Sequence, residues 1–116
     1  MPKIQMVTGI IRECSVEKLE DVKLIEGIIE QAVKFMELTL LKTISHKFTP
    51  GGLTSVALLA ESHIAVHTYP EEGAIFLDVM SCGQRDAKMV FDIMEKGLGG
   101  KAEIVLDNVN VIGRGR

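Results

Sequence analysis

Four strand-like runs follow one another in the middle of this sequence, and only short turns separate them. The runs cover residues 40–48, 53–60, 62–68 and 74–79. Pro50, Gly51 and Gly52 mark one turn, and a second turn is expected at residues 69–73. Parallel neighbours need a crossover of about a dozen residues, so strands joined by such turns are expected to pair antiparallel.

Two segments with helical periodicity flank these strands. Apolar residues recur at three- and four-residue intervals between residues 18 and 38, which predicts a helix with Ser15 at its N-cap. Residues 84–96 predict a second helix, with Gly97 in the C′ position that favours left-handed backbone. Gly27 lies inside the first helix and costs it about 1 kcal/mol relative to alanine.

Strands are also expected at both ends of the pattern, at residues 4–11 and 101–112. Gly9 inside the first of them marks a bulge or a close approach of another chain segment. The last strand is expected to be interrupted at Asp107 and Asn108, which are poor strand formers. The whole order predicts an α+β two-layer sandwich, in which an antiparallel sheet carries two helices on one face. A chain of 116 residues has the size of one domain, so residues 1–116 are expected to share one core.

Composition argues against several classes of protein. Apolar residues make up 47% of the chain, which favours a globular fold over disorder. The net charge of −3 argues against nucleic acid as a partner, because phosphate binding needs a basic surface. No apolar run approaches the roughly 18 residues of a membrane span, and residues 1–9 lack the long apolar segment of a secretory signal.

The two cysteines, Cys14 and Cys82, lie far apart in the sequence. They form no CxxC pair, so a reduced, cytoplasmic protein is expected, although a disulfide between them stays open. Cys82 belongs to the stretch 53–83, which also contains two of the three histidines. This stretch is therefore the first place to look for chemistry.

Glu61, Ser62, His63 and His67 form the most suggestive group in that stretch. A shared metal ion is disfavoured, because two histidines four apart on a strand are separated by roughly 13 Å, whereas a Zn–N bond is about 2.1 Å. A conventional serine triad is also disfavoured. No G-x-S-x-G elbow is present, and Ser62 and His63 point to opposite faces of a strand.

A third interpretation is self-processing at a serine. The hydroxyl attacks the carbonyl of the preceding peptide bond, and β-elimination of the resulting ester gives dehydroalanine, which hydrolyses to a pyruvoyl group. A pyruvoyl carbonyl forms a Schiff base with a substrate amine and acts as an electron sink for decarboxylation without pyridoxal phosphate. The spacing of the residues does not by itself select this chemistry.

Longer motifs around these residues resemble those of a known family. Residues 59–71 read LAESHIAVHTYPE, which is similar to the LAESHxxxHTWPE motif of prokaryotic S-adenosylmethionine decarboxylases, pyruvoyl enzymes of polyamine (spermidine) synthesis. Residues 77–83 resemble the family's xDVxxCG motif, and residues 46–52 resemble HxFxPxG. Arg114-Gly115 resembles its terminal RG. The resemblance implies decarboxylation of S-adenosylmethionine as the activity.

The resemblance also implies how the chain is processed. Cleavage is expected between Glu61 and Ser62, which gives a small chain of residues 1–61 and a large chain of residues 62–116 with a pyruvoyl group derived from Ser62. Thr54 is expected to assist by hydrogen bonding near the scissile bond. His67 is expected to act as the base for the elimination.

Three further residues receive roles in catalysis from the resemblance. Cys82 is expected to donate the proton that quenches the carbanion after carbon dioxide leaves. Phe48 is expected to stack on the adenine of the substrate, and Glu71 to accept hydrogen bonds from its ribose hydroxyls. No metal is expected, and Cys14, His46 and His63 receive no chemical role.

The resemblance implies a homodimer of processed protomers with shared active sites. Ser62 and His67 differ by an odd number of positions, so on one regular strand they face opposite sides. The sequence therefore suggests that Ser62 and Cys82 of one protomer meet the Phe48, Thr54, His67 and Glu71 set of the other. Two alternatives remain: a pyruvoyl-dependent arginine or ornithine decarboxylase on the same scaffold, and an unprocessed regulatory paralogue.

Overall fold

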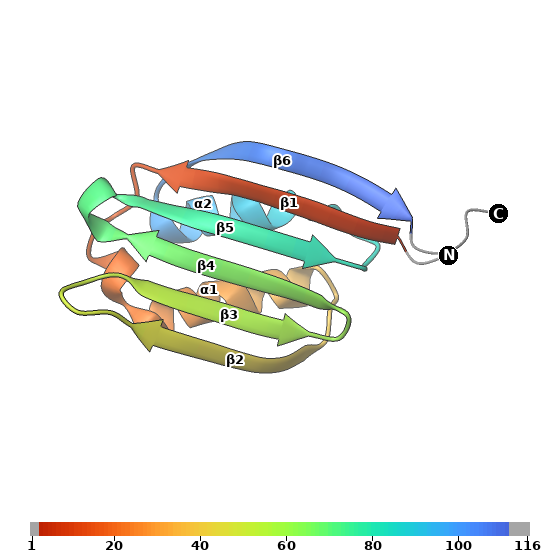
Figure 1. Cartoon of the computed structure of the whole chain (residues 1–116), viewed down its shortest axis with the longest axis horizontal. Helices are drawn as coiled ribbons and strands as arrows, with labels where there is room; N and C mark the ends of the chain where they lie inside the picture. The colour runs from red at the N-terminus through yellow and green to blue at the C-terminus, as the bar shows by residue number, and fades with distance from the viewer. Residues whose placement is uncertain (1–2, 112–116) are drawn as a thin grey trace.

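The computed structural model describes residues 3–111, and an antiparallel sheet of six strands dominates it (Figure 1). The strands are β1 (Lys3–Arg12), β2 (Leu40–Lys47), β3 (Leu53–Leu59), β4 (Ser62–Tyr69), β5 (Ala74–Ser81) and β6 (Lys101–Val111). Their order across the sheet is β2-β3-β4-β5-β1-β6. Helices α1 (Val22–Phe35) and α2 (Met89–Leu98) both lie on one face of the sheet. The predicted α+β two-layer sandwich is confirmed.

The core lies between the helices and the sheet face that they cover. Alternate residues of each strand point to that face, so Val7, Ile64 and Leu77 are completely buried. The buried residues of α1 are Ile25, Ile28, Ile29, Ala32 and Val33. Burial of each large apolar side chain stabilises the fold by roughly 1.5–3 kcal/mol, so the sheet and both helices are held by one shared core.

The start of α1 differs from the prediction. It begins at Val22 rather than at residue 18, because the Asp21 side chain accepts a hydrogen bond from the Leu24 N–H and caps the helix. Ser15 is therefore wrong as the cap. It lies in the turn before the short 3-10 helix η1 (Lys18–Glu20).

The boundaries of α2 also differ. This helix begins at Met89 rather than at residue 84, and Gly99 rather than Gly97 has left-handed backbone, with φ 76°. Gly97 lies inside the helix, where a β-carbon would be 2.5 Å from Cδ1 of Ile28. Its missing side chain therefore permits close packing of α2 on α1.

The last strand runs without a break through Asp107 and Asn108, so the predicted interruption there is wrong. Instead the register between β1 and β6 shifts beside Gly9, and Val105 is left without a β1 partner. A β-carbon on Gly9 would collide with the carbonyl oxygen of Glu103. Glycine is therefore required at this close approach of β6, and the predicted bulge or close approach at Gly9 is confirmed.

Cys14 and Cys82 are both free thiols, so the disulfide that the sequence left open does not form. No helix among residues 3–111 combines the length and the apolar character that crossing a membrane requires. Arg114 and Gly115, which carry part of the family resemblance, lie outside the described residues.

Candidate active site

The turn between β3 and β4 contains the expected cleavage position. Leu59 pairs with Ser62, so Ala60 and Glu61 form a two-residue turn. Glu61 has φ 61°, in the left-handed region that residues with a side chain adopt at a cost of roughly 1–2 kcal/mol. The Ala60 N–H donates to the Thr39 carbonyl at 3.0 Å, which fixes the turn against the segment after α1. The peptide bond before Ser62 therefore begins in a strained and anchored turn.

Cys82 contacts both sides of that peptide bond. Ser62 is buried, and its Oγ accepts a hydrogen bond from the Cys82 N–H at 3.0 Å. The Cys82 thiol donates to the Glu61 carbonyl oxygen, also at 3.0 Å. A donor on this oxygen polarises the carbonyl toward attack by a nearby hydroxyl, and it stabilises the negative charge that develops there.

A second group of expected site residues lies at the other end of β4. Thr54 pairs with His67 across the β3–β4 ladder, and Thr54 Oγ1 lies 2.9 Å from His67 Nδ1. This contact holds the imidazole ring and leaves Nε2 as the nitrogen that can exchange a proton with a bound group. Phe48 and Glu71 line the same cavity of about 290 Å³ as Thr54 and His67.

Tyr69 also lines this cavity and was missed by the sequence analysis. The feature of the sequence that could have pointed to Tyr69 is an aromatic residue inside a predicted turn, two positions before Glu71. Phe48 is held from the side by His46, with ring centroids 4.7 Å apart in an edge-to-face arrangement. Two aromatic residues therefore border one cavity, and His46, which had received no role, supports one of them.

The loop between β2 and β3 is tied down from the helix side of the sheet. The Gly52 N–H donates to a carboxylate oxygen of Glu20 at 3.0 Å, and Gly52 has φ 92°, which favours glycine. Thr68 Oγ1 accepts from the Leu53 N–H and donates to the Leu19 carbonyl, both at 2.9 Å. These contacts fix the position of the loop that carries Phe48.

The structure thus assembles the expected site residues into two groups rather than one. Ser62 and Cys82 lie at one end of β4, and the His67 cavity lies at the other. His67 lies five positions after Ser62, which is about 16 Å along the strand. The two residues also face opposite sides of the sheet, as the sequence predicts: Ser62 is buried beneath the helices, and His67 lies on the uncovered face.

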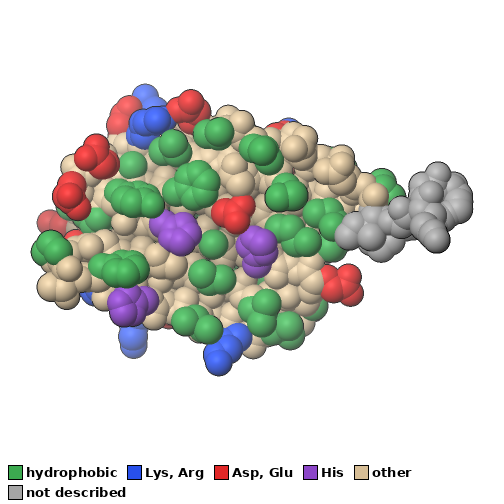
Figure 2. All heavy atoms as spheres, viewed as in Figure 1, with side chains coloured by type: hydrophobic (Ala, Val, Ile, Leu, Met, Phe, Trp, Pro, Cys, Tyr) green, Lys and Arg blue, Asp and Glu red, His purple; other side chains and the backbone are tan. Residues whose placement is uncertain are grey.

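Apolar side chains are spread over that uncovered face, which we name the open face, among histidines and other polar groups (Figure 2). Cross-strand pairing arranges it in three rows. The His67 row contains His46, Thr54, His67, Phe76, Ile10 and Glu103. The Asp78 row contains Ile44, Val56, Ala65, Asp78, Thr8 and Leu106. The His63 row contains Lys42, Leu58, His63, Met80, Met6 and Asn108.

His63 has a partner on the open face, which gives this residue a structural role. Its Nε2 lies 3.2 Å from a carboxylate oxygen of Asp78, near the middle of the face. His63 and Ser62 point to opposite faces, so this contact does not make His63 part of the Ser62 group. Among residues 3–111, no three His, Cys, Asp or Glu side chains are grouped in a way that could hold a metal ion.

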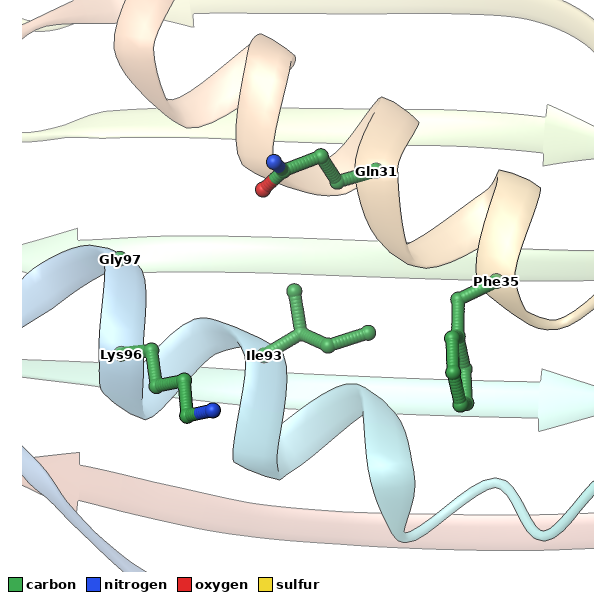
Figure 3. Close-up of a pocket in the computed structure, with 5 residues that line it drawn as sticks. All are labelled: Gln31, Phe35, Ile93, Lys96 and Gly97. Carbon is green, nitrogen blue, oxygen red and sulfur yellow. The ribbon is translucent and has the colours of Figure 1, made fainter.

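A larger cavity of about 500 Å³ lies on the opposite side of the molecule, between α1 and α2 (Figure 3). Its lining residues are Gln31, Phe35, Ile93, Lys96 and Gly97. None of them belongs to either group of expected site residues, and Lys96 is the only ionisable group of the five. The Ser62 turn and the His67 cavity are therefore better candidates for the active site than this larger cavity.

Comparison with known proteins identifies the family of the chain. A sequence model of the family described as S-adenosylmethionine decarboxylase matches residues 6–109. A protein of Prochlorococcus marinus (strain MIT 9211) named S-adenosylmethionine decarboxylase proenzyme is 48% identical over 73 residues, which are 63% of this chain and 60% of that relative. The proenzyme of Symbiobacterium thermophilum is 35% identical over 96 residues, which are 82% of this chain and 73% of that relative.

A solved structure shares the whole fold. The crystal structure of the adenosylmethionine decarboxylase from Aquifex aeolicus VF5 matches 99% of this chain and 95% of that chain, with a TM-score of 0.80 and 30% identity. The family model covers the six strands and both helices almost completely. The chain therefore belongs to the S-adenosylmethionine decarboxylase family.

Proposed function

We propose that this chain is the proenzyme of a pyruvoyl-dependent decarboxylase that acts on S-adenosylmethionine and supplies the aminopropyl donor for spermidine synthesis. The observation that carries the proposal is the double contact of Cys82, with its thiol on the Glu61 carbonyl and its N–H on Ser62 Oγ. The names of the matched relatives, which are proenzymes of this activity, support the same reading.

The proposed self-processing begins with these atoms. Ser62 Oγ bonds to the Glu61 carbonyl carbon as the C–N bond breaks, which leaves an ester and a free Ser62 amine. The partner's His67 then removes the α-proton of Ser62, and the C–O bond breaks to release Glu61 as a carboxylate. The remaining dehydroalanine takes up water and loses ammonia. The products are residues 1–61 and residues 62–116, the latter with a pyruvoyl terminus.

The processed site requires neither pyridoxal phosphate nor a metal ion in this account. The pyruvoyl group supplies an electron sink for the loss of carbon dioxide from an α-amino acid. Cys82 is placed beside residue 62 and returns a proton to the substrate carbon. In the His67 cavity, Phe48 and Tyr69 offer aromatic surfaces to adenine, and the Glu71 carboxylate accepts hydrogen bonds from the ribose hydroxyls.

A homodimer brings the two groups together. In the proposed dimer, two protomers pack through their open faces. The two-fold axis lies midway between the two sheets, parallel to the Asp78 row and perpendicular to the strands. This axis places the Asp78 row of one protomer against the Asp78 row of its partner. It also sets the His67 row of each protomer against the His63 row of its partner. The Ser62 end of one β4 then lies opposite the His67 cavity of the other.

The open face has the character of such an interface. Exposed apolar side chains on it include Met6, Ile44, Leu58, Tyr69 and Leu106. A sheet face that exposes several large apolar side chains is typical of an interaction surface rather than of a surface left in water. The two free thiols agree with the cytoplasm as the proposed location.

The substrate is tested by offering the processed protein S-adenosylmethionine, arginine and ornithine, each labelled in its carboxyl group. We expect labelled carbon dioxide from S-adenosylmethionine alone. Glu71→Gln, which weakens acceptance from the ribose hydroxyls, is expected to raise KM about tenfold or more. Release of labelled carbon dioxide from arginine or ornithine, with none from S-adenosylmethionine, would contradict the proposed substrate. It would favour an amino-acid decarboxylase on this scaffold instead.

A further inference from the structure

One polar side chain interrupts the apolar surface that β1 presents to the helices. Val7 and Ile11 on this surface are completely buried apolar residues, and Gln5 is almost as deeply buried, with 6% of its surface exposed. A buried amide destabilises a fold unless its hydrogen bonds are satisfied. The partners of Gln5 therefore indicate why a glutamine occupies this position.

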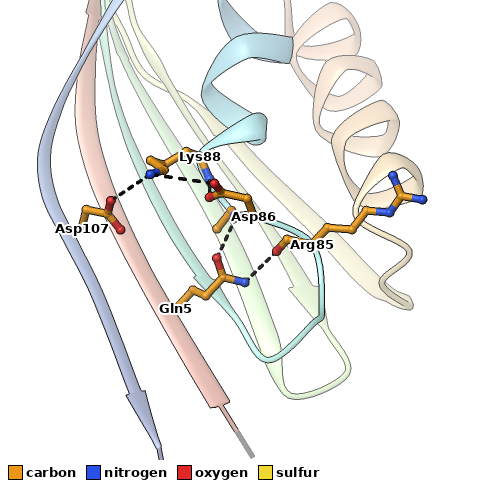
Figure 4. Close-up of polar contacts among 6 residues, drawn as sticks. Gln5, Arg85, Asp86, Lys88 and Asp107 are labelled. Atoms are coloured by element: carbon orange, nitrogen blue, oxygen red, sulfur yellow. Dashed lines mark hydrogen bonds and ion pairs between the residues drawn. The ribbon is translucent and has the colours of Figure 1, made fainter.

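Those partners belong to the loop that follows Cys82 (Figure 4). Gln5 Nε2 donates to the Arg85 carbonyl at 2.7 Å and to the Gly83 carbonyl at 3.4 Å. Gln5 Oε1 accepts from the Ala87 N–H at 2.8 Å. One side chain thus pairs with three backbone groups of a segment that has no strand ladder of its own.

Gln5 is also adjacent to the base of this loop in the sheet. It pairs with Ser81 across the β1–β5 ladder, and Ser81 Oγ accepts from the Gly83 N–H at 3.0 Å. Ser81 is completely buried, so the residues on both sides of Cys82 are held from within the core. The chain therefore has little freedom at the position of the thiol.

The other ties of the loop lie on the surface. Arg85 pairs with Glu37 at 3.2 Å, and Lys88 pairs with Asp107 at 3.4 Å (Figure 4 shows the second pair). Side chains in these pairs are between 40% and 70% exposed, and ion pairs in that situation contribute little. The Gln5 amide therefore supplies the buried polar contacts that hold the loop, beside the apolar packing of Ala87 in the core.

We propose that Gln5 is a positioning residue for Cys82, and that it holds the 83–87 loop so that the thiol stays on the Glu61 carbonyl. The proposal rests on the proposed function, in which Cys82 serves both the cleavage and the return of a proton. A displacement of about 1 Å in a reacting group lowers a rate by up to about 100-fold. Loss of the Gln5 contacts is expected to act through such a displacement.

The test compares Gln5→Met, which keeps the shape of the side chain and removes all three contacts, with Val7→Ala. Val7 lies two residues along on the same buried surface, so its substitution weakens the core without touching the loop. The first readout is the rate of cleavage, by intact mass. The second is alkylation of Cys82 by iodoacetamide in a Ser62→Ala background, where every chain stays uncut. Cys14, which is buried, serves as the internal reference.

Gln5→Met is expected to slow cleavage about tenfold or more and to speed alkylation of Cys82 about tenfold. Val7→Ala is expected to keep the cleavage rate and the alkylation rate within about twofold of the parent values. Equal behaviour of the two variants would overturn the proposal. If Gln5→Met does not fold, Gln5→Glu is used, because it keeps the acceptor for Ala87 and loses both donor contacts. Absence of cleavage in the unsubstituted chain would defeat the proposed function, whereas the alkylation readout would still decide the role of Gln5.

Discussion

At the scale of single residues, burial separates the two cysteines into different roles. Cys14 is buried with its thiol donating to the Ile11 carbonyl, and desolvation raises the pKa of that thiol. It therefore stays protonated and unreactive in the core. Cys82 is partly accessible and contacts both atoms that react in the proposed cleavage. The sequence predicted a role for Cys82 only through its motif. The contacts that support this role form because the end of β5 lies beside the turn between β3 and β4.

Glu61 offers a test of strain at the proposed cleavage site. In a Ser62→Ala background, Glu61→Gly is expected to raise the free energy of unfolding by about 0.5–1 kcal/mol, because glycine adopts φ 61° without steric cost. Urea denaturation measures the change. Ala60→Gly is the matched control: φ of Ala60 is not positive, so it should lower stability by about the same amount. A loss of stability in both variants would contradict the strain argument.

Thr54 offers a test of how His67 is oriented. Thr54→Val keeps the shape of the side chain and removes the hydroxyl that contacts Nδ1, so the imidazole is free to turn. Cleavage, followed by intact mass over time, is expected to slow about tenfold or more. Thr54→Ser retains the hydroxyl and is expected to cleave at close to the parent rate. Equal rates for the valine and serine variants would show that the contact has no part in processing.

At the scale of elements, the alternation of apolar residues and the short turns were enough to predict every strand and both helices. The helix ends were harder, because capping depends on contacts that periodicity does not encode. Asp21 rather than Ser15 caps α1, and the loop before α2 is held by Gln5 from a strand far away in the sequence. A glycine inside a strand run was enough to predict the bulge or close approach at Gly9, whereas the sequence could not show that β6 is the strand that packs there.

Two glycines inside helices are expected to respond in opposite directions. No atom lies within 4 Å of a β-carbon added to Gly27, so Gly27→Ala should raise the free energy of unfolding by about 1 kcal/mol. A β-carbon at Gly97 would lie 2.5 Å from Ile28 Cδ1, so Gly97→Ala should lower it by about 1–3 kcal/mol. Thermal and urea denaturation of both variants measure the changes. The same sign for both would contradict the helix packing described here.

At the scale of the whole molecule, one protomer holds its expected site residues at two opposite ends of β4. The parity of Ser62 and His67 predicted opposite faces, and the structure agrees. Parity could not predict that Phe48, Thr54 and Glu71 would join His67 around one cavity, because that depends on how the 48–53 loop folds back against η1. The proposed dimer is the arrangement that unites the two groups.

The proposed site, shared between two protomers, predicts complementation between inactive chains. Ser62→Ala alone is expected to stay whole, and His67→Ala alone to be cut slowly. When the two are co-expressed with tags of different mass, the His67→Ala chain is expected to be cut at close to the parent rate, because its Ser62 meets the intact His67 of the partner. The Ser62→Ala chain should remain whole in the same sample. Failure of the His67→Ala chain to be cut in the mixture would contradict a site built from two protomers.

The most direct test of the account is the intact mass of the purified, denatured protein. We expect two fragments divided between Glu61 and Ser62, and the larger should carry a pyruvoyl group in place of its N-terminal serine. Ser62→Ala, the matched control, should give one full-length mass. A single full-length mass for the unsubstituted chain, after prolonged incubation in the folded state, would contradict self-processing and with it the proposed decarboxylase.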